Sequence, residues 1–371
     1  TILFRWENMA SIGVGAFVLS IFWRWSMERK ARGAVSTGPS LFARALEAVR
    51  QPKPRYTCLG LIAVLMLVMP YISSMYQINI MISALIYIML GLGLNIVVGL
   101  AGQLVLGYAA FYAVGAYTYG LLNTYFGLGF WAVLPVGGIM AALFGLMLGF
   151  PVLRLKGDYL AIVTLACGEI IKTIINNLSV TGGAKGLDTS AIYADTRTLL
   201  PFAIVLIFLV VLVMMNLKNS RHGRAIMAIR DNRIAAESNG VNVTYYKLMV
   251  FVLAAFFAGM AGVLYGHTLA NIKPAMFDYN MSIEILVIVV LGGMGSIRGS
   301  IIATIILRAL PEVLRQVADY RMLAYSVLLI VIMLLNSSPQ FAEWKGRWSL
   351  KALLSLGKTR KEKTKKEAAK K

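Results

Sequence analysis

Residues 218–247 read KNSRHGRAIMAIRDNRIAAESNGVNVTYYK and form a basic, polar segment between two apolar runs, which end at Leu217 and resume at Leu248. The lysine and arginine residues of this segment are opposed only by Asp231 and Glu237. Both apolar runs are long enough to cross a bilayer, and short loops rich in lysine and arginine stay on the cytoplasmic side. The sequence therefore predicts a cytoplasmic loop at 218–247 within a helical membrane protein.

The middle of this loop carries a helical pattern. Ile226, Ile229, Arg230 and Arg233 follow the spacing i, i+3, i+4, i+7, and several alanines, which favour helices, lie among them. The pair Asn239-Gly240 is a common helix end. We expect one short amphipathic helix here. It is either a docking element for a soluble partner or part of a solvated connecting loop.

The composition excludes an ordinary soluble domain. Of the 371 residues, 59% are hydrophobic and 14% are charged, and the mean hydropathy is +0.74. A soluble chain of this kind would have to expose most of its apolar groups. The net charge of +20 does not indicate a nucleic-acid partner, because the basic residues cluster at the ends of apolar runs and in a tail. The fold class is an all-α integral membrane protein.

The apolar runs predict a polytopic bundle of about ten spans, since a span needs about 17–25 residues. The basic regions then all fall on one side, with the N-terminus outside and the C-terminus in the cytoplasm. The predicted organisation is an N-terminal span within 1–27, a basic cytoplasmic loop at 28–55, a transmembrane domain at 56–336 and a basic tail at 337–371. The predicted spans are 10–23, 56–75, 78–100, 104–124, 131–153, 159–178, 199–217, 248–270, two helices or half-helices within 281–314, and 322–335.

The basic tail is expected to lie against anionic lipid headgroups. Its Gly357-Lys358-Thr359 resembles the end of a phosphate-binding loop, but Ala352 stands where that motif requires its first glycine. The sequence shows no catalytic motif and no cluster of metal ligands: His222 and His267 lie far apart in the predicted topology. We therefore expect a translocating protein without catalytic or metal-binding residues.

Polar residues within the predicted spans are candidates for a substrate path. Asn95, Gln103, Tyr108 and Tyr112 occur in a glycine-rich stretch, where interrupted helices can line a cavity. The alternative is tight helix packing by small residues, with an aromatic belt.

A second set of candidates lies near the middle of 159–178. Glu169 shares a helical face there with Lys172, Thr173 and Asn176. An ionisable pair inside a span is costly unless it faces protein or water, so Glu169 and Asn176 either line a path or belong to a pair that fixes packing.

A further helix break is predicted at GGMGSIRG, residues 292–299. Its glycines are Gly292, Gly293, Gly295 and Gly299.

Four stretches resemble the permease subunit of bacterial branched-chain amino acid ABC importers, the LivM-type subunit. They are GLGLNIVVGLAGQLVLGYAAFYAVGAY (91–117), LGFPVLRLKGDYLAIVTLACGEI (148–170), TGG (181–183) and VLGGMGS (290–296). They occur in the family's order within residues 80–335. The resemblance implies a multi-pass protein of the bacterial plasma (inner) membrane. It also implies a second permease subunit, two ATPase subunits that hold ATP and Mg, and an extracytoplasmic solute-binding protein that delivers leucine, isoleucine or valine.

The resemblance also implies a role for the basic loop. Ala235-Ala236-Glu237, followed by Gly240, is similar to the "EAA" loop that fits a groove on the ATPase, although the order of letters departs from EAA-x-x-x-G. With Arg230 and Asp231, these residues are the expected coupling contacts. Other functions stay open: a related ABC permease for urea, amides or sugars, an ion-coupled secondary transporter, or a membrane scaffold.

Overall fold

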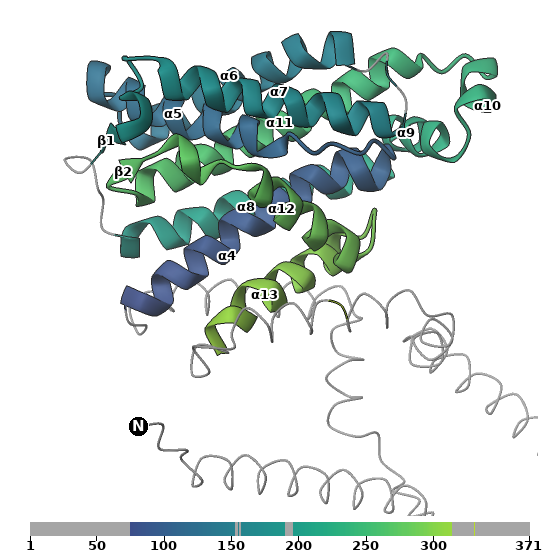
Figure 1. Cartoon of the computed structure of the whole chain (residues 1–371). Helices are drawn as coiled ribbons and strands as arrows, with labels where there is room; N and C mark the ends of the chain where they lie inside the picture. The colour runs from purple at the N-terminus through teal and green to yellow at the C-terminus, as the bar shows by residue number, and fades with distance from the viewer. Residues whose placement is uncertain (1–74, 153–154, 156, 190–195, 314–329, 331–371) are drawn as a thin grey trace, which may run out of the picture. The chain divides into compact units, whose positions relative to one another are not determined.

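The structure is a computed structural model of the whole chain (Figure 1), and it describes residues 75–152, 155, 157–189, 196–313 and 330. These residues belong to a unit that spans Met66–Lys371. The predicted spans at 10–23 and 322–335, most of that at 56–75, the basic loop at 28–55 and the basic tail lie outside the described residues, apart from Ile330.

The described part is helical almost throughout, with a two-stranded antiparallel sheet that the sequence analysis did not predict. In that sheet, Leu187 pairs with Ile272 and Asp188 with Asn271. In chain order the elements are α4 (Met75–Leu94), the π-helix η1 (Asn95–Leu100), α5 (Tyr108–Phe126), α6 (Phe130–Val152), α7 (Asp158–Asn177), η2 (Gly183–Lys185), β1 (Leu187–Asp188), α8 (Thr196–Asn219), α9 (Arg221–Asp231), α10 (Arg233–Ser238), α11 (Val243–Thr268), β2 (Asn271–Ile272), η4 (Pro274–Met276), α12 (Tyr279–Gly292) and α13 (Ile297–Val313).

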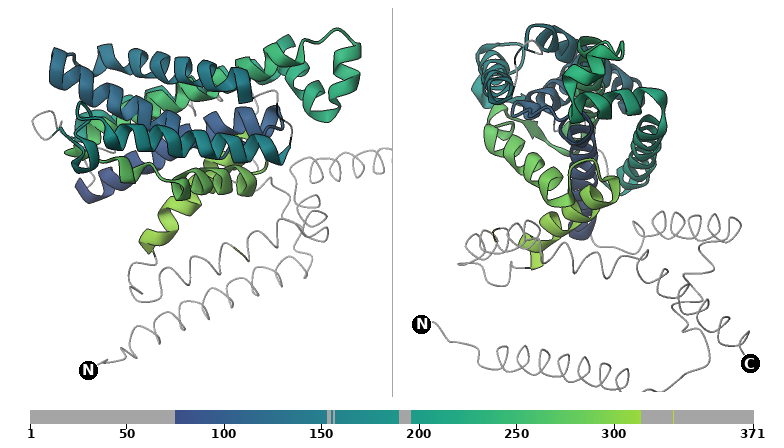
Figure 2. Two further views of the ribbon diagram at one scale, coloured as in Figure 1. Left: turned by 45° about the horizontal axis from the view of Figure 1, so that its top comes forward. Right: turned by 90° about the vertical axis from the view of Figure 1, so that its right-hand side faces the viewer.

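Five helical segments within the described residues are long and apolar enough to cross a membrane. They are Met75–Leu100, Phe130–Pro151, Leu199–Asn219, Val243–Thr268 and Pro274–Gly292. Together with the polytopic arrangement of broken helices, they confirm the predicted class of an all-α integral membrane bundle. The long helices run between two ends of the bundle, with the β1–β2 sheet at one end and α9 and α10 at the other (Figures 1 and 2).

Helix α11 is the central element, and α5 and α6 pack along it. Small residues allow the close contact: a Cβ atom on Gly115 of α5 would overlap the backbone of Gly259 in α11, and one on Gly262 would overlap the Tyr112 carbonyl. In lipid, helix association depends on such close packing. Helix α5, which is not one of the five apolar segments above, is therefore largely buried.

Three local predictions are wrong. The spans predicted at 56–75 and 78–100 are joined by a turn at 76–77 in that prediction, but Tyr76 and Gln77 lie within α4. The span predicted to begin at Leu104 begins at Tyr108, because the chain is non-helical over most of 101–107. The loop helix is two helices, α9 and α10, separated at Asn232, whose backbone is extended (φ −154°, ψ 107°).

We predict that Gly115→Val lowers the free energy of unfolding by about 3 kcal/mol or more, because the side chain has no space against the Gly259 backbone. Gly129→Ala is the control, since nothing lies within 4 Å of a Cβ at that position. Melting of the purified variants in detergent measures the difference. Equal melting temperatures would show that α5 and α11 do not make this contact.

Candidate functional site

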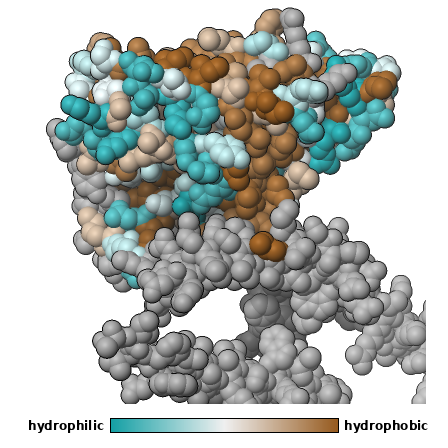
Figure 3. All heavy atoms as spheres, in the orientation of Figure 1, coloured by the Kyte–Doolittle hydropathy of each residue, from teal (hydrophilic) through white to brown (hydrophobic). Residues whose placement is uncertain are grey.

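A polar face runs along α7. Glu169, Lys172, Thr173 and Asn176 share this face, and Lys172 Nζ donates to Glu169 Oε2 at 3.3 Å. The pair is not enclosed: the side chains of Glu169 and Lys172 are 44% and 29% exposed, and Thr173 and Asn176 are exposed as well. Figure 3 views the face covered by α7 and α12, where hydrophilic residues gather over the left part and reach the middle. Such a surface beside membrane spans requires water or protein against it, not lipid.

The N-termini of α5 and α12 meet beside this face. The backbone N–H of Ala109 donates to Ser282 Oγ at 3.0 Å, and that of Leu106 donates to Thr164 Oγ1 at 3.2 Å. A small hollow opens here between the two helix starts and Glu169, with a cavity volume of about 10 Å³. This is room for about one water molecule. Interrupted helices whose N-termini point into the bundle are the usual components of a transport site.

The other candidates for the substrate path lie in the interior. Asn95, Gln103, Tyr108 and Tyr112 are at most 3% exposed. The Tyr108 hydroxyl donates to the Ala254 carbonyl at 3.0 Å, whereas the polar side-chain atoms of Gln103 and the Tyr112 hydroxyl have no hydrogen-bond partner among the described residues. The structure thus separates these four residues from Glu169 and Asn176, which line the polar face.

Asn95 connects two helix breaks that lie about two hundred positions apart in the chain. Its Oδ1 accepts from the Gly295 N–H at 2.7 Å, and its Nδ2 donates to the Ser296 carbonyl at 3.3 Å and to Ser300 Oγ at 3.0 Å. We call residues 293–296, which lie between α12 and α13, the elbow. In the elbow the backbone of Gly293 and Gly295 is left-handed, with φ of +87° and +78°. Asn95 is the first residue of η1, so its hydrogen bonds fasten the helical segment that leads into the first break to the elbow.

Two cations near α9 bind the same pair of breaks. Arg230 Nη1 donates to the Gly99 carbonyl at 2.7 Å, and Lys218 Nζ donates to the Gly295 carbonyl at 2.7 Å. The Gly99 carbonyl lies in the last turn of η1, where carbonyl groups lack partners within the helix and carry a partial negative charge, so a cation is favourable there. The Gly295 carbonyl lies in the elbow, and Lys218 supplies its donor. Arg230 also forms an exposed ion pair with Asp231 at 3.3 Å, and such pairs contribute little.

The predicted coupling residues divide into inward and outward groups. Ala236 is buried against Ile229 and Val243 and holds α10 to α9 and α11. Ala235, Glu237 and Gly240 are exposed. Ile234, which the sequence analysis did not select, is also outward and 76% exposed. The outward side of α10 therefore carries an apolar side chain next to the exposed Glu237.

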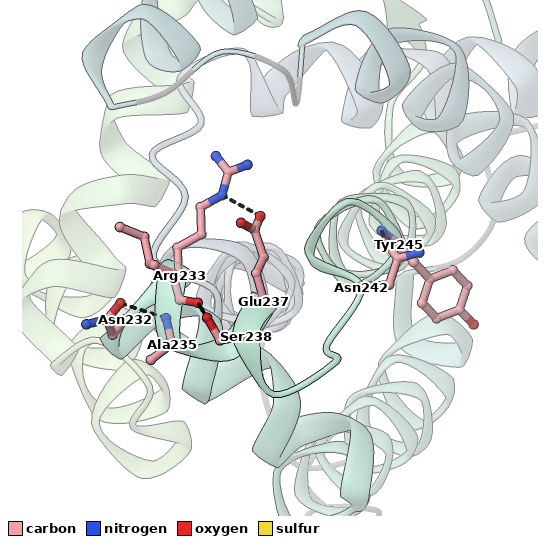
Figure 4. A network of polar contacts seen from close by, with 8 residues as sticks. Asn232, Arg233, Ala235, Glu237, Ser238, Asn242 and Tyr245 are labelled. Atoms are coloured by element: carbon pink, nitrogen blue, oxygen red, sulfur yellow. Dashed lines mark hydrogen bonds and ion pairs between the residues drawn. The ribbon is translucent and has the colours of Figure 1, made fainter.

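Side-chain caps define α9 and α10. Ser220 Oγ accepts from the Gly223 N–H at 3.1 Å, and Asn232 Oδ1 accepts from the Ala235 N–H at 3.1 Å. Figure 4 shows the Asn232 cap together with the ion pair of Arg233 and Glu237 at 3.0 Å. Caps of this kind stop one helix and start the next. This explains why the alanine-rich pattern does not give one continuous helix.

A charged cluster that was not predicted from the sequence joins α4, α12 and α13. Glu284 Oε2 accepts from Arg308 Nη2 at 3.1 Å and from the Tyr87 hydroxyl at 3.3 Å. The Arg308 guanidinium lies 3.1 Å from the centroid of the Tyr87 ring. The sequence could indicate only that Glu284 lies within a predicted span, because its partners lie in other helices.

The geometry describes a membrane bundle with broken central helices and a separate polar loop. The family model described as "Branched-chain amino acid transport system / permease component" matches residues 76–337. The chain belongs to this family. The permease match covers every helix described above, so the polar face, the two breaks and the α9–α10 loop are parts of a permease component.

Curated relatives agree with this assignment. The chain is 41% identical over 309 residues to the high-affinity branched-chain amino acid transport system permease protein LivM of Escherichia coli strain K12, covering 74% of this chain and 73% of the relative. It is 38% identical over 296 residues to the LivM protein of Salmonella typhimurium, covering 71% and 70%. It is also 31% identical over 121 residues to the E. coli permease protein LivH, covering 32% and 39%. No solved structure matches the chain.

We predict that Asn232→Ala destabilises α10 by about 1 kcal/mol, because the Ala235 N–H loses its cap. Amide hydrogen exchange should become faster over 235–238 and stay unchanged in α5. Ile234→Ala is the control, since it removes an exposed side chain and leaves the cap in place. Unchanged exchange in Asn232→Ala would mean that the cap does not separate α9 from α10.

Proposed function

We propose that this permease component is the LivM-type subunit of an ATP-driven importer of leucine, isoleucine and valine. It forms the translocation path with a second permease subunit, and two ATPase subunits that bind ATP and Mg drive it. A solute-binding protein delivers the amino acid from the other side of the membrane. The similarity to LivM proteins at 38–41% identity over about 70% of the chain carries this proposal, and the partial similarity to LivH supports a second, related subunit.

The polar face of α7 is our candidate for the path. A zwitterionic amino acid with an apolar side chain needs only a few polar contacts along a largely apolar route. The half-buried Glu169 and the exposed Asn176 can provide them, and the starts of α5 and α12 lie beside Glu169. The second permease subunit covers this face and separates it from lipid, which would otherwise be unfavourable for the Glu169–Lys172 pair.

The outward side of α10 is our candidate for the ATPase contact. Ile234, Ala235 and Glu237 are exposed there, and Ala236 anchors the helix to the bundle. The excess of basic residues in the loop supports a cytoplasmic location for it in a bacterial inner membrane protein, and with it the proposed orientation of the N-terminus outside and the C-terminus inside. Closure of the ATPase dimer then moves the loop, and the gap between the two permease subunits opens alternately to each side.

We predict that Ile234→Asp lowers the affinity of the permease for its ATPase at least about tenfold, because an apolar anchor becomes charged. Val180→Asp is the matched control. It also places a charge on an exposed apolar residue, but in the turn after α7. Co-purification of the ATPase with each variant measures the effect. Equal recovery in both variants would place the docking surface elsewhere.

We predict that Glu169→Gln lowers ATP-driven uptake of labelled leucine in proteoliposomes about tenfold, which is about 1.4 kcal/mol in the barrier. The control is Ile170→Val, an exposed apolar neighbour on the same helix. Uptake should also require every other component of the importer, each omitted in turn. Leucine uptake by this chain alone on an ion gradient would contradict the proposed function and indicate a secondary transporter instead.

A further inference from the structure

The loop that we assign to the ATPase is bonded directly to both helix breaks. Lys218 lies in the last turn of α8, where the loop begins, and Arg230 in the last turn of α9; their side chains donate to the carbonyls of Gly295 and Gly99, respectively. Both contacts are direct hydrogen bonds between the side chain and the backbone carbonyl. A displacement of α9 therefore acts on the end of η1 and on the elbow at the same time.

The end of η1 and the elbow are joined in two ways: Asn95, the first residue of η1, binds the elbow, and the backbone of Gly99 packs against Gly295. Asn95 is 0% exposed, and its side-chain amide makes three hydrogen bonds across to the elbow and the start of α13. The backbones are also in close contact. A Cβ atom on Gly99 would overlap both Asn95 Oδ1 and the Gly295 nitrogen. A buried amide with all of these bonds satisfied fixes the relative position of the elements that it joins.

The second break is itself a tight crossing of α12 and α13. A Cβ on Gly292 would lie 2.5 Å from the Ser300 nitrogen, and one on Gly299 would overlap the Gly292 carbonyl. α12 leads from the elbow to Ser282, whose hydroxyl accepts from the first turn of α5. The chain of contacts thus runs from α9 to the elbow, along α12, and on to the hollow beside Glu169.

From this geometry we infer that Asn95 is a positioning residue for transport. It holds the end of η1 and the elbow as one rigid group, and Lys218 and Arg230 attach that group to the ATPase-driven loop. The inference rests on the proposed function for the source of the motion. It assigns Asn95 to energy coupling and not to substrate contact, and it assigns Arg230 to an internal bond and not to the ATPase surface.

The first arm of the test compares Asn95→Leu and Lys218→Met with Thr304→Val in the reconstituted complex. Thr304→Val is the matched control, because it removes one buried hydrogen bond on α13, to the Ser300 carbonyl, and leaves both breaks joined. We expect the amount of leucine moved per ATP hydrolysed to fall at least about fivefold in the two test variants and to stay unchanged in the control. If uptake and hydrolysis fall in proportion, the role of Asn95 is purely structural and the inference is wrong.

The second arm needs no amino acid, so it separates this inference from the proposed substrate. The distance between the loop and the elbow is measured with two spin labels, in a chain from which Cys58 and Cys167 have been removed. The labels are attached at Ala228→Cys in α9 and at Met294→Cys in the elbow, which are both exposed positions. With Asn95 and Lys218 intact, ATP should leave the distance distribution unchanged. In the two test variants ATP should shift or broaden it.

A shift of the labels on ATP addition to the intact complex would overturn the inference. If the labels stay together but leucine is not transported, the proposed substrate fails and the linkage stands. Where Asn95→Leu does not reach the membrane, Asn95→Asp replaces it, because this variant keeps the acceptor for the Gly295 N–H and loses the donor to Ser296 and Ser300. It should then show the same change in distance distribution as Lys218→Met.

Discussion

A broken helix inside a membrane exposes carbonyl and amide groups that lipid cannot bind, and the protein must satisfy them internally. The present structure does so with side chains from distant parts of the chain. Arg230 and Lys218 donate to carbonyls at the two breaks, and Asn95 serves an amide and a carbonyl of the elbow. The requirement to satisfy these groups therefore joins the soluble loop to the centre of the bundle.

Glycine makes this arrangement sterically possible. The close approach of Gly99 to Gly295 leaves no room for a Cβ, and the contact of Gly115 with Gly259 brings α5 equally close to α11. The contact with Gly259 keeps α5 enclosed, while α7 presents a polar side to the second subunit that we propose. Both α5 and α7 are only moderately hydrophobic. In α5 the small residues that allow close packing lower the hydropathy, and in α7 the polar residues of its exposed face do.

Much of the fold followed from the sequence, because hydrophobic runs and basic loops report directly on membrane spans. The runs at 131–153, 159–178 and 199–217 correspond closely to α6, α7 and α8. The glycine pattern at 292–299 likewise indicated the elbow. What the sequence could not supply were pairings over long separations, such as Asn95 with Gly295 or Glu284 with Arg308. Local propensity also misjudged Asn232, whose cap divides a stretch that alanines favour as one helix.

The most direct test is a structure of the assembled importer determined by electron cryo-microscopy without nucleotide and with ATP bound. Our account predicts that Arg230 Nη1 stays within hydrogen-bond distance of the Gly99 carbonyl, and Lys218 Nζ of the Gly295 carbonyl, in both states. Helix α9, the end of η1 and the elbow should superimpose as one group while the rest of the bundle moves around them. An Arg230 side chain that leaves Gly99 and binds the ATPase in either state would contradict the account.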